Sequence, residues 1–159
     1  MNAEYTQIGD WKHDRVGAGV LIEEGRVLLV GNAWYPGEPL VWTLPQGRAT
    51  AEESVEAAAA REFAEETGLE VRVGPLLYVA EARSMVRRRL FLTCAFRVTR
   101  TGGTLHTAGD PVVRDARFVP LADLPAVLPH ASLGAPLNYV LTHPAAPVRY
   151  WFFPEYTAE

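Results

Sequence analysis

AAAAREFAEETGLE, residues 57–70, predicts a strong helix and also its end. Alanine is the best helix former, and four of them stand together at 57–60. Gly68 suits the left-handed residue that follows a helix. Working outward, Thr50 with Glu53 three residues later resembles a capping box, so we expect the helix to run from about Ala51 to Thr67.

The acidic residues in this helix lie where helix physics disfavours them. Glu62 and Glu66 are four apart and share a face, and Glu65 follows Glu62 by three, so like charges cost roughly 0.2–0.5 kcal/mol per pair. They also crowd the C-terminal end, the negative pole of the helix dipole. Local rules broken together often mark a functional site.

The bulk composition is that of an ordinary globular protein. We expect residues 1–159 to form a single domain. The chain has 48% hydrophobic and 21% charged residues, so its composition indicates neither disorder nor a coiled coil. A net charge of −4 argues against a broad nucleic-acid-binding surface. Lone Cys94 cannot form an internal disulfide.

Targeting and membrane signals are not found in the sequence. The N-terminal stretch MNAEYTQIGDWKHDR has no apolar signal region, and no run reaches the roughly 18 apolar residues of a spanning helix. We therefore expect no membrane partner and, by default, a cytoplasmic location.

Apolar runs predict a strand-rich chain. VGAGVLI (16–22) and RVLLVGN (26–32) favour a hairpin or a closely linked strand pair. Further strands are expected at 41–44, 69–82, 88–100 and 116–121, and helical segments at 121–129 and 132–143. This order is typical of a layered α/β or α+β domain with a mixed sheet covered by helices.

The region around the helix also matches a known family motif. From Gly47, five residues lead to Glu53, and seven more lead to Arg61-Glu62-Phe63-Ala64-Glu65-Glu66-Thr67-Gly68-Leu69. This resembles the signature of the Nudix (MutT-like) hydrolases at every fixed position. WTLPQG before the motif and DARFVPLADLP (115–125) after it are also similar to the family. The resemblance implies an α/β fold, a Nudix-type α/β/α sandwich with a mixed sheet and a loop–helix–loop catalytic motif.

The resemblance implies a hydrolase that cleaves the pyrophosphate linkage of a nucleoside diphosphate derivative, such as a nucleoside triphosphate, a nucleotide sugar or a dinucleoside polyphosphate. Glutamates repel such anions unless hard cations intervene, and Mg²⁺ prefers oxygen ligands. We therefore expect Mg²⁺, with Mn²⁺ as an alternative. The implied metal ligands are Gly47 through its carbonyl, Glu62, Glu65 and Glu66, with Glu65 as third ligand or water activator.

Two further motif positions are implied to be catalytic. Glu53 is either an indirect metal partner or the residue that orients Arg61, although a cap of the helix would also explain it. Arg61 could instead simply pair with Glu65. The implied catalytic set is therefore Glu62, Glu65, Glu66, Arg61 and Glu53.

Several residues outside the motif have two readings. Of Arg87, Arg88 and Arg89, at most two can face one cleft if the segment is a strand, and a solvated turn is the alternative. Trp34, Tyr35 and Trp42 could stack on a nucleobase or belong to the core. Asp110 and Asp115 follow a loop where family members often add an acidic ligand, and spacing does not decide between them. The tail aromatics Trp151, Phe152 and Phe153 either close the core or bury a homodimer interface.

The leading hypothesis is a Mg²⁺-dependent pyrophosphohydrolase with a small nucleotide substrate. One rival removes pyrophosphate from an RNA 5′ end, which the acidic net charge disfavours and the arginine triplet favours. The second rival is a sensor that binds a nucleotide without cleaving it. The last is an acidic helix with no metal.

Overall fold

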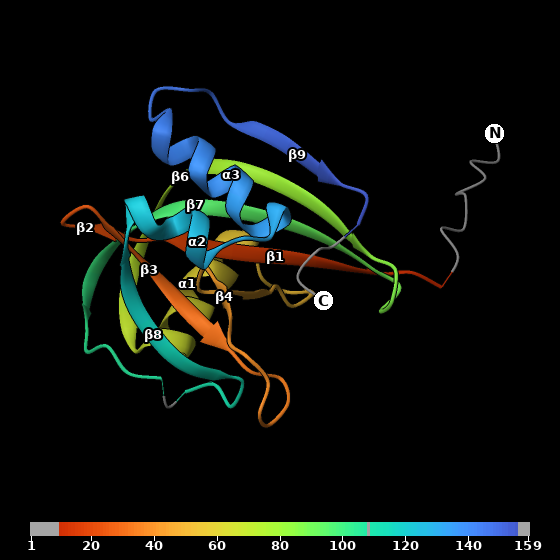
Figure 1. Ribbon diagram of the computed structural model, residues 1–159, viewed down its shortest axis with the longest axis horizontal. Helices are drawn as coiled ribbons and strands as arrows, with labels where there is room; N and C mark the ends of the chain where they lie inside the picture. Colours follow the sequence, from red (N-terminus) through yellow and green to blue (C-terminus); the bar gives the residue numbers. More distant parts are fainter. Residues whose placement is uncertain (1–9, 108, 156–159) are drawn as a thin grey trace.

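A computed structural model describes residues 10–107 and 109–155 of the chain (Figure 1). Its strands are β1 (Lys12–Val20), β2 (Ile22–Glu23), β3 (Arg26–Asn32), β4 (Val41–Thr43), β5 (Gln46–Arg48), β6 (Leu69–Ser84), β7 (Arg89–Gly103), β8 (Val113–Pro120) and β9 (Arg149–Phe153). Its helices are α1 (Val55–Thr67), the 3₁₀ turn η1 (Leu121–Asp123), α2 (Leu124–Val127) and α3 (Ala131–Thr142). The expectation of a single domain over residues 1–159 stays a prediction.

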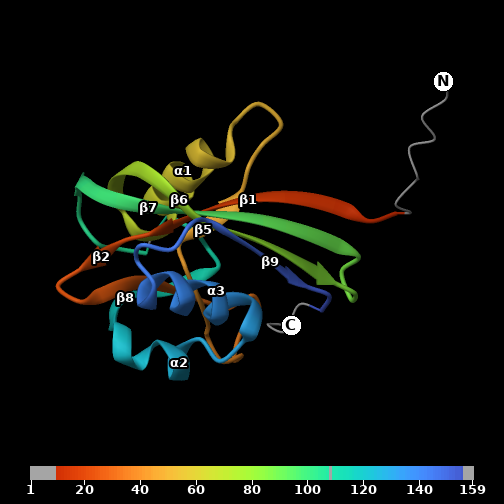
Figure 2. The same ribbon diagram turned by 90° about the horizontal axis from the view of Figure 1, so that it is seen from above.

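Two sheets form the centre of the fold. The first has five strands in the order β5-β1-β7-β6-β9, and it is mixed because β1 pairs with β7 and β6 pairs with β9 in parallel. The second is antiparallel and is built on β3, which pairs with β2 and β4 and also with β8. Helix α1 lies on one side of the five-stranded sheet, and α2 and α3 lie on the other (Figure 2). The predicted mixed sheet with helices on both sides is confirmed.

The expected pairing of segments 16–22 and 26–32 is wrong for most of its length. Strand β1 pairs with β5 and β7 in the first sheet, so within the segment 16–22 only β2 is a strand that pairs with β3. The tight turn between β2 and β3 uses the positive φ angles of Glu24 (49°) and Gly25 (72°). An apolar run indicates a strand but does not identify its partner, and here the chain changes sheets near Leu21.

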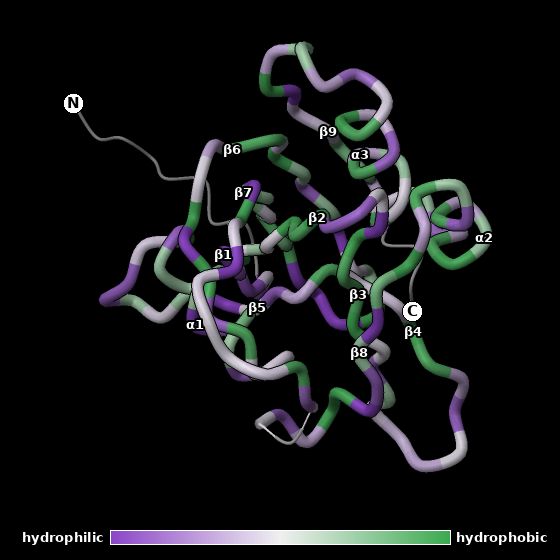
Figure 3. Tube along the Cα trace, turned by 90° about the vertical axis from the view of Figure 1, so that its left-hand side faces the viewer, coloured by the Kyte–Doolittle hydropathy of each residue, from purple (hydrophilic) through white to green (hydrophobic). Residues whose placement is uncertain are grey.

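The core fills the space between the two sheets and the space under α1. The hydrophobic run of β3, green in Figure 3, is buried, with Val27, Leu28, Leu29 and Val30 fully inaccessible. Phe63 of α1 is equally buried in a smaller cluster with Leu69 and Val98.

Helix α1 begins later than the sequence suggests. Its cap is Ser54, whose side-chain oxygen accepts a hydrogen bond from the Ala57 N–H at 3.0 Å. Thr50 does donate its N–H to Glu53 Oε1 at 3.2 Å, as a capping box requires, but this contact closes a turn that precedes the helix. The predicted cap at Thr50 is therefore wrong, whereas Gly68 ends the helix with φ 70° as predicted.

Glycines of β1 allow α1 to lie directly on the sheet. A Cβ at Gly17 would come within 2.0 Å of the Val55 carbonyl oxygen, and one at Gly19 within 2.5 Å of the Phe63 ring. Ala58 and Ala59 are fully buried in this contact. The close approach fixes the acidic end of α1 beside β5.

The aromatic tail forms β9 at the edge of the first sheet. Trp151 and Phe153 pack against the main core, while Tyr150 and Phe152 are exposed on the other face. The tail therefore closes the core with alternate residues, one of the two uses expected for it. A homodimer interface stays a prediction.

Candidate active site

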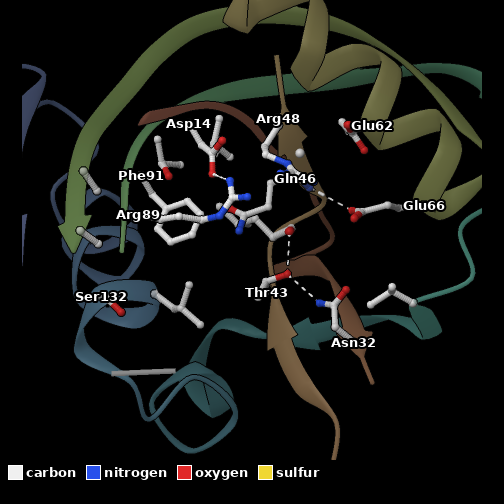
Figure 4. A pocket seen from close by; sticks show the side chains of 18 of the residues that line it. Asp14, Asn32, Thr43, Gln46, Arg48, Glu62, Glu66, Arg89, Phe91 and Ser132 are labelled. Atoms are coloured by element: carbon white, nitrogen blue, oxygen red, sulfur yellow. Dashed lines mark hydrogen bonds and ion pairs between the residues drawn. The ribbon is translucent and has the colours of Figure 1, made fainter. Parts of the chain in front are cut away.

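A cavity of about 520 Å³ opens between the first sheet, including its edge strand β5, the acidic end of α1 and the start of α3. Glu62 and Glu66 lie at one end of it, Gln46 and Arg48 in the middle, and Asp14, Arg89 and Phe91 toward the other end (Figure 4). The described part of the chain contains no helix long and apolar enough to cross a membrane.

Glu66 is the most buried acidic side chain of the motif, with 6% of its surface exposed. One carboxylate oxygen accepts the Gln46 backbone N–H at 2.9 Å. Burial raises its pKa to about 8, and the nearby charges of Glu62, Asp110 and Glu65 act in the same direction. The group is therefore held in a site that favours its neutral form unless positive charge is supplied.

Glu62 lies against β5. Its carboxyl group occupies the space that a side chain at Gly47 would need, since a Cβ built there would meet the Glu62 carboxyl carbon at 2.0 Å. Burial raises the pKa of Glu62, against the lowering effect of Arg61. Gly47 does not have the positive φ that would explain a glycine by backbone conformation, so space for Glu62 is the reason for it.

Arg61 joins three glutamates. Its guanidinium donates to Glu53 at 2.6 Å, to Glu62 at 2.7 Å and to Glu65 at 3.1 Å. It also donates to the Arg48 carbonyl oxygen at 3.0 Å, which ties the helix to the end of β5. The hydrogen bond from Arg61 holds the pKa of Glu53 below its ordinary value. Glu53 therefore contacts the site through Arg61.

Glu65 lies apart from the other two predicted ligands. Its side chain is 48% exposed, it contacts Arg61, and it does not line the cavity. Within residues 10–107 and 109–155, no three Asp, Glu, His or Cys side chains are close enough together to form a metal-binding group. The structure thus brings Glu62 and Glu66 to the cavity and leaves Glu65 on the adjoining surface.

Asp110 is an acidic residue that the sequence could not separate from Asp115. Asp110 lines the cavity, accepts the Val112 N–H at 2.6 Å, and raises the pKa of Glu62 and of Glu66 by its charge. Asp115 belongs to β8, opposite Gly31 of β3, and does not line the cavity. Their position after the loop was the only signal in the sequence, and the fold places Asp110, but not Asp115, at the cavity.

Comparison with known proteins identifies the family. The model of the NUDIX domain matches residues 11–138. The chain belongs to the NUDIX domain family. This match supports the prediction of a Nudix pyrophosphohydrolase. A comparison with curated proteins gives no match.

Solved structures share the fold. A NUDIX hydrolase from Nitrosomonas europaea has a TM-score of 0.73 at 19% identity, covering 92% of this chain and 82% of that one. An ADP-ribose pyrophosphatase from Streptococcus suis has a TM-score of 0.61 at 19% identity, covering 86% and 98%. A UDP-X diphosphatase has a TM-score of 0.69 at 18% identity, covering 92% and 70%.

Near the Nudix motif, the arginine triplet spans a turn and a strand end. Arg87 and Arg88 lie in the turn between β6 and β7, where Arg88 has a positive φ of 49°, and Arg89 begins β7. Arg87 and Arg89 line the cavity, and Arg88 does not. Of the three aromatic candidates, only Trp34 lines the cavity, where the Arg87 guanidinium lies 5.9 Å from its ring centre. Tyr35 is exposed, and Trp42 packs against the core under Arg117.

Proposed function

We propose that this Nudix protein is a divalent-metal-dependent pyrophosphohydrolase acting on a nucleoside diphosphate derivative. The proposal is carried by the burial of the Glu66 carboxyl group in the cavity wall, near the acidic side chains of Glu62 and Asp110. Buried carboxylates side by side are unfavourable without a compensating cation. A cation would relieve this repulsion and would allow the cavity to accept an anionic pyrophosphate.

The chemistry of the donors fits Mg²⁺, which takes oxygen ligands from a few carboxylates, carbonyls and substrate phosphates. Glu62 and Glu66 would hold the ion, with the carbonyl of Gly47 beside them, and Asp110 would have to move toward them to become a third carboxylate ligand. Glu65 would join by exchanging its contact with Arg61. Mn²⁺ accepts the same ligand types. When bound, such an ion neutralises phosphoryl charge and makes water more acidic.

The remaining motif residues act by orientation. Arg61 donates to Glu62 and so fixes the direction of its carboxylate, while Glu53 and the Arg48 carbonyl hold the guanidinium in place. The Gln46 N–H does the same for Glu66. Arg61 and Glu53 are therefore positioning residues in this proposal.

The size of the cavity supports a small-molecule substrate. Its volume of about 520 Å³ lies within the range of roughly 300–1,000 Å³ that is usual for such sites. The names of two structurally similar proteins, an ADP-ribose pyrophosphatase and a UDP-X diphosphatase, fit the same substrate class.

The test is release of phosphate or nucleoside monophosphate from a substrate panel, with Mg²⁺, with Mn²⁺ and with chelator. The panel contains nucleoside triphosphates, nucleotide sugars, dinucleoside polyphosphates and 5′-triphosphorylated RNA. Wild type is compared with Glu66→Gln and with Glu56→Gln, which removes an exposed glutamate from the first turn of the same helix. We expect metal-dependent cleavage that Glu66→Gln abolishes and Glu56→Gln leaves intact.

Other outcomes would favour the rival functions. Cleavage of RNA at a rate that falls steeply with salt would indicate the RNA 5′ pyrophosphohydrolase, because contacts to a phosphate backbone are salt-sensitive. Nucleotide binding without cleavage of any substrate would contradict the proposal and indicate a sensor.

A further inference from the structure

The outer edge of β9 is open to pairing. Strand β9 is the last strand of the first sheet, and within residues 10–107 and 109–155 it pairs with β6 alone (Figure 1). Proteins usually blunt such an edge with a charge, a proline or a bulge, because its outward backbone N–H and C=O groups can pair with another chain. Here Pro147 and Pro154 lie just outside the strand. The one charge within it, Arg149, has its guanidinium over the rings of Tyr139 and Trp151. The centre of the edge is therefore unprotected.

Aromatic side chains beside this edge are exposed and held in place. Tyr150 is 57% exposed and Phe152 45% exposed. The Tyr150 hydroxyl donates to Glu81 at 2.8 Å, and the Arg83 guanidinium lies 5.0 Å from the centre of the Phe152 ring. Leu92 of β7, in register with Glu81 and Phe152, is also exposed and extends the apolar surface. An ordered apolar surface of this kind is typical of a protein interaction site.

We propose that β9 pairs with β9 of a second copy of the chain, antiparallel about a twofold axis at Trp151. The two five-stranded sheets then form one continuous sheet. In this register, Tyr150 of each copy lies directly opposite Phe152 of the other, on the exposed face. Such a dimer is independent of the substrate that the cavity takes.

The strand is complementary to itself in this orientation. Aromatic residues directly opposite each other are among the favourable cross-strand pairs, and the dimer contains two pairs of Tyr150 with Phe152. Arg149 begins the strand and Glu155 follows its end. Antiparallel pairing brings the cation of each copy toward the carboxylate of the other, whereas parallel pairing would bring like charges together. These features favour a second copy over an unrelated peptide.

The symmetry also limits the assembly to two copies. A twofold contact uses the same edge of both chains, so it closes on itself and leaves no further β9 edge for a third chain. The pairing is short, with five residues from each chain, and its area falls at the low end of specific interfaces. We therefore expect a dissociation constant in the micromolar range.

The test is sedimentation velocity of the full chain over a range of concentrations around this value. Tyr150→Lys and Phe152→Glu change the exposed rings of β9, which are not part of the core. Matched controls are Tyr35→Lys and Val86→Glu, because both residues are exposed, at 66% and 84%, and lie outside β9. Circular dichroism checks that each variant is folded.

Wild type should change from one chain to two as its concentration rises, and the controls should do the same. Tyr150→Lys and Phe152→Glu should each weaken this association by about tenfold or more, since each loses both aromatic pairs and places like charges diagonally across the axis. An equimolar mixture of the two variants should recover dimers. In the mixed dimer, the lysine of one chain lies opposite the glutamate of the other, and one aromatic pair remains.

Three results would overturn the proposal. The first is wild-type protein that stays a single chain at all concentrations, which would leave the edge to another partner. The second is a dimer that the β9 variants weaken no more than the controls do, which would place the interface elsewhere. The third is a mixture of the two variants that associates no better than either variant alone, which would exclude the antiparallel register.

Discussion

The Glu62 carboxyl group lies directly over Gly47, where a Cβ would come within 2.0 Å of its carboxyl carbon. We predict that Gly47→Ala pushes this carboxylate aside and lowers hydrolysis by at least about tenfold, as small misplacements of reacting groups do. The fold should tolerate the change with a loss under about 1 kcal/mol, because a flexible side-chain end can move. Steady-state kinetics and urea unfolding test both parts. A large loss of stability with normal activity in the folded fraction would contradict this.

Gly17→Ala is the structural counterpart of that variant. Its Cβ would meet backbone atoms of α1, the Val55 carbonyl oxygen at 2.0 Å and the Ala59 nitrogen at 2.6 Å, and backbone cannot swing away. We expect destabilisation of about 3 kcal/mol or more, as for a severe overpacking of the core. Urea unfolding gives the value, and an unchanged midpoint would show that α1 does not rest on β1 this closely.

The motif region could be predicted from sequence because its information is local. The spacing of Glu62 and Glu66 puts both on one helix face, and the structure brings both to the cavity. A glycine just past the last helical residue likewise predicted the helix end at Gly68. These rules need no knowledge of the tertiary fold.

The sequence predictions failed where contacts between residues far apart in the chain determine the local structure. Thr50 matches a capping box better than Ser54 does, yet the Arg15 guanidinium donates to the Thr50 carbonyl oxygen at 2.6 Å and Arg61 donates to that of Arg48, so this segment stays a loop. The ion pair of Asp14 and Arg89 joins residues 75 positions apart through the parallel pairing of β1 with β7. Local patterns do not contain that pairing.

Two variants distinguish a helix cap at Ser54 from one at Thr50. Ser54→Ala removes the side-chain acceptor of the Ala57 N–H and should cost about 1 kcal/mol, the usual value for a lost cap. Thr50→Ala retains the backbone N–H that contacts Glu53, so it should cost less than about 0.5 kcal/mol. Equal losses in the two variants would favour the cap at Thr50.

A variant of Arg61 tests whether the orientation of the Glu62 carboxylate matters to activity. Lysine keeps the positive charge but cannot reproduce the planar fork that contacts Glu53, Glu62 and the Arg48 carbonyl together. We expect Arg61→Lys to lower kcat by about tenfold or more with a smaller effect on KM. The control is Arg26→Lys, whose partner Glu24 is exposed, and whose effect should be negligible. Comparable kinetic losses in both variants would show that Arg61 has no specific orienting role in the site.

The raised pKa of Glu66 should make the stability of the metal-free protein depend on pH. Its folded-state pKa is about 8, above the ordinary 4.5, so the folded chain binds this proton more tightly than the unfolded chain. The contribution to stability is therefore full below pH 4.5 and is lost as pH rises toward 8, at about 1.4 kcal/mol for each unit of pKa difference. Urea unfolding with chelator at pH 5 and pH 8 should show that the stability of wild type decreases, and that the decrease is much smaller in Glu66→Gln. Mg²⁺ should restore wild-type stability at pH 8 by favouring the charged carboxylate. An identical pH dependence in the two proteins would mean that Glu66 is not held in a site that disfavours its charge.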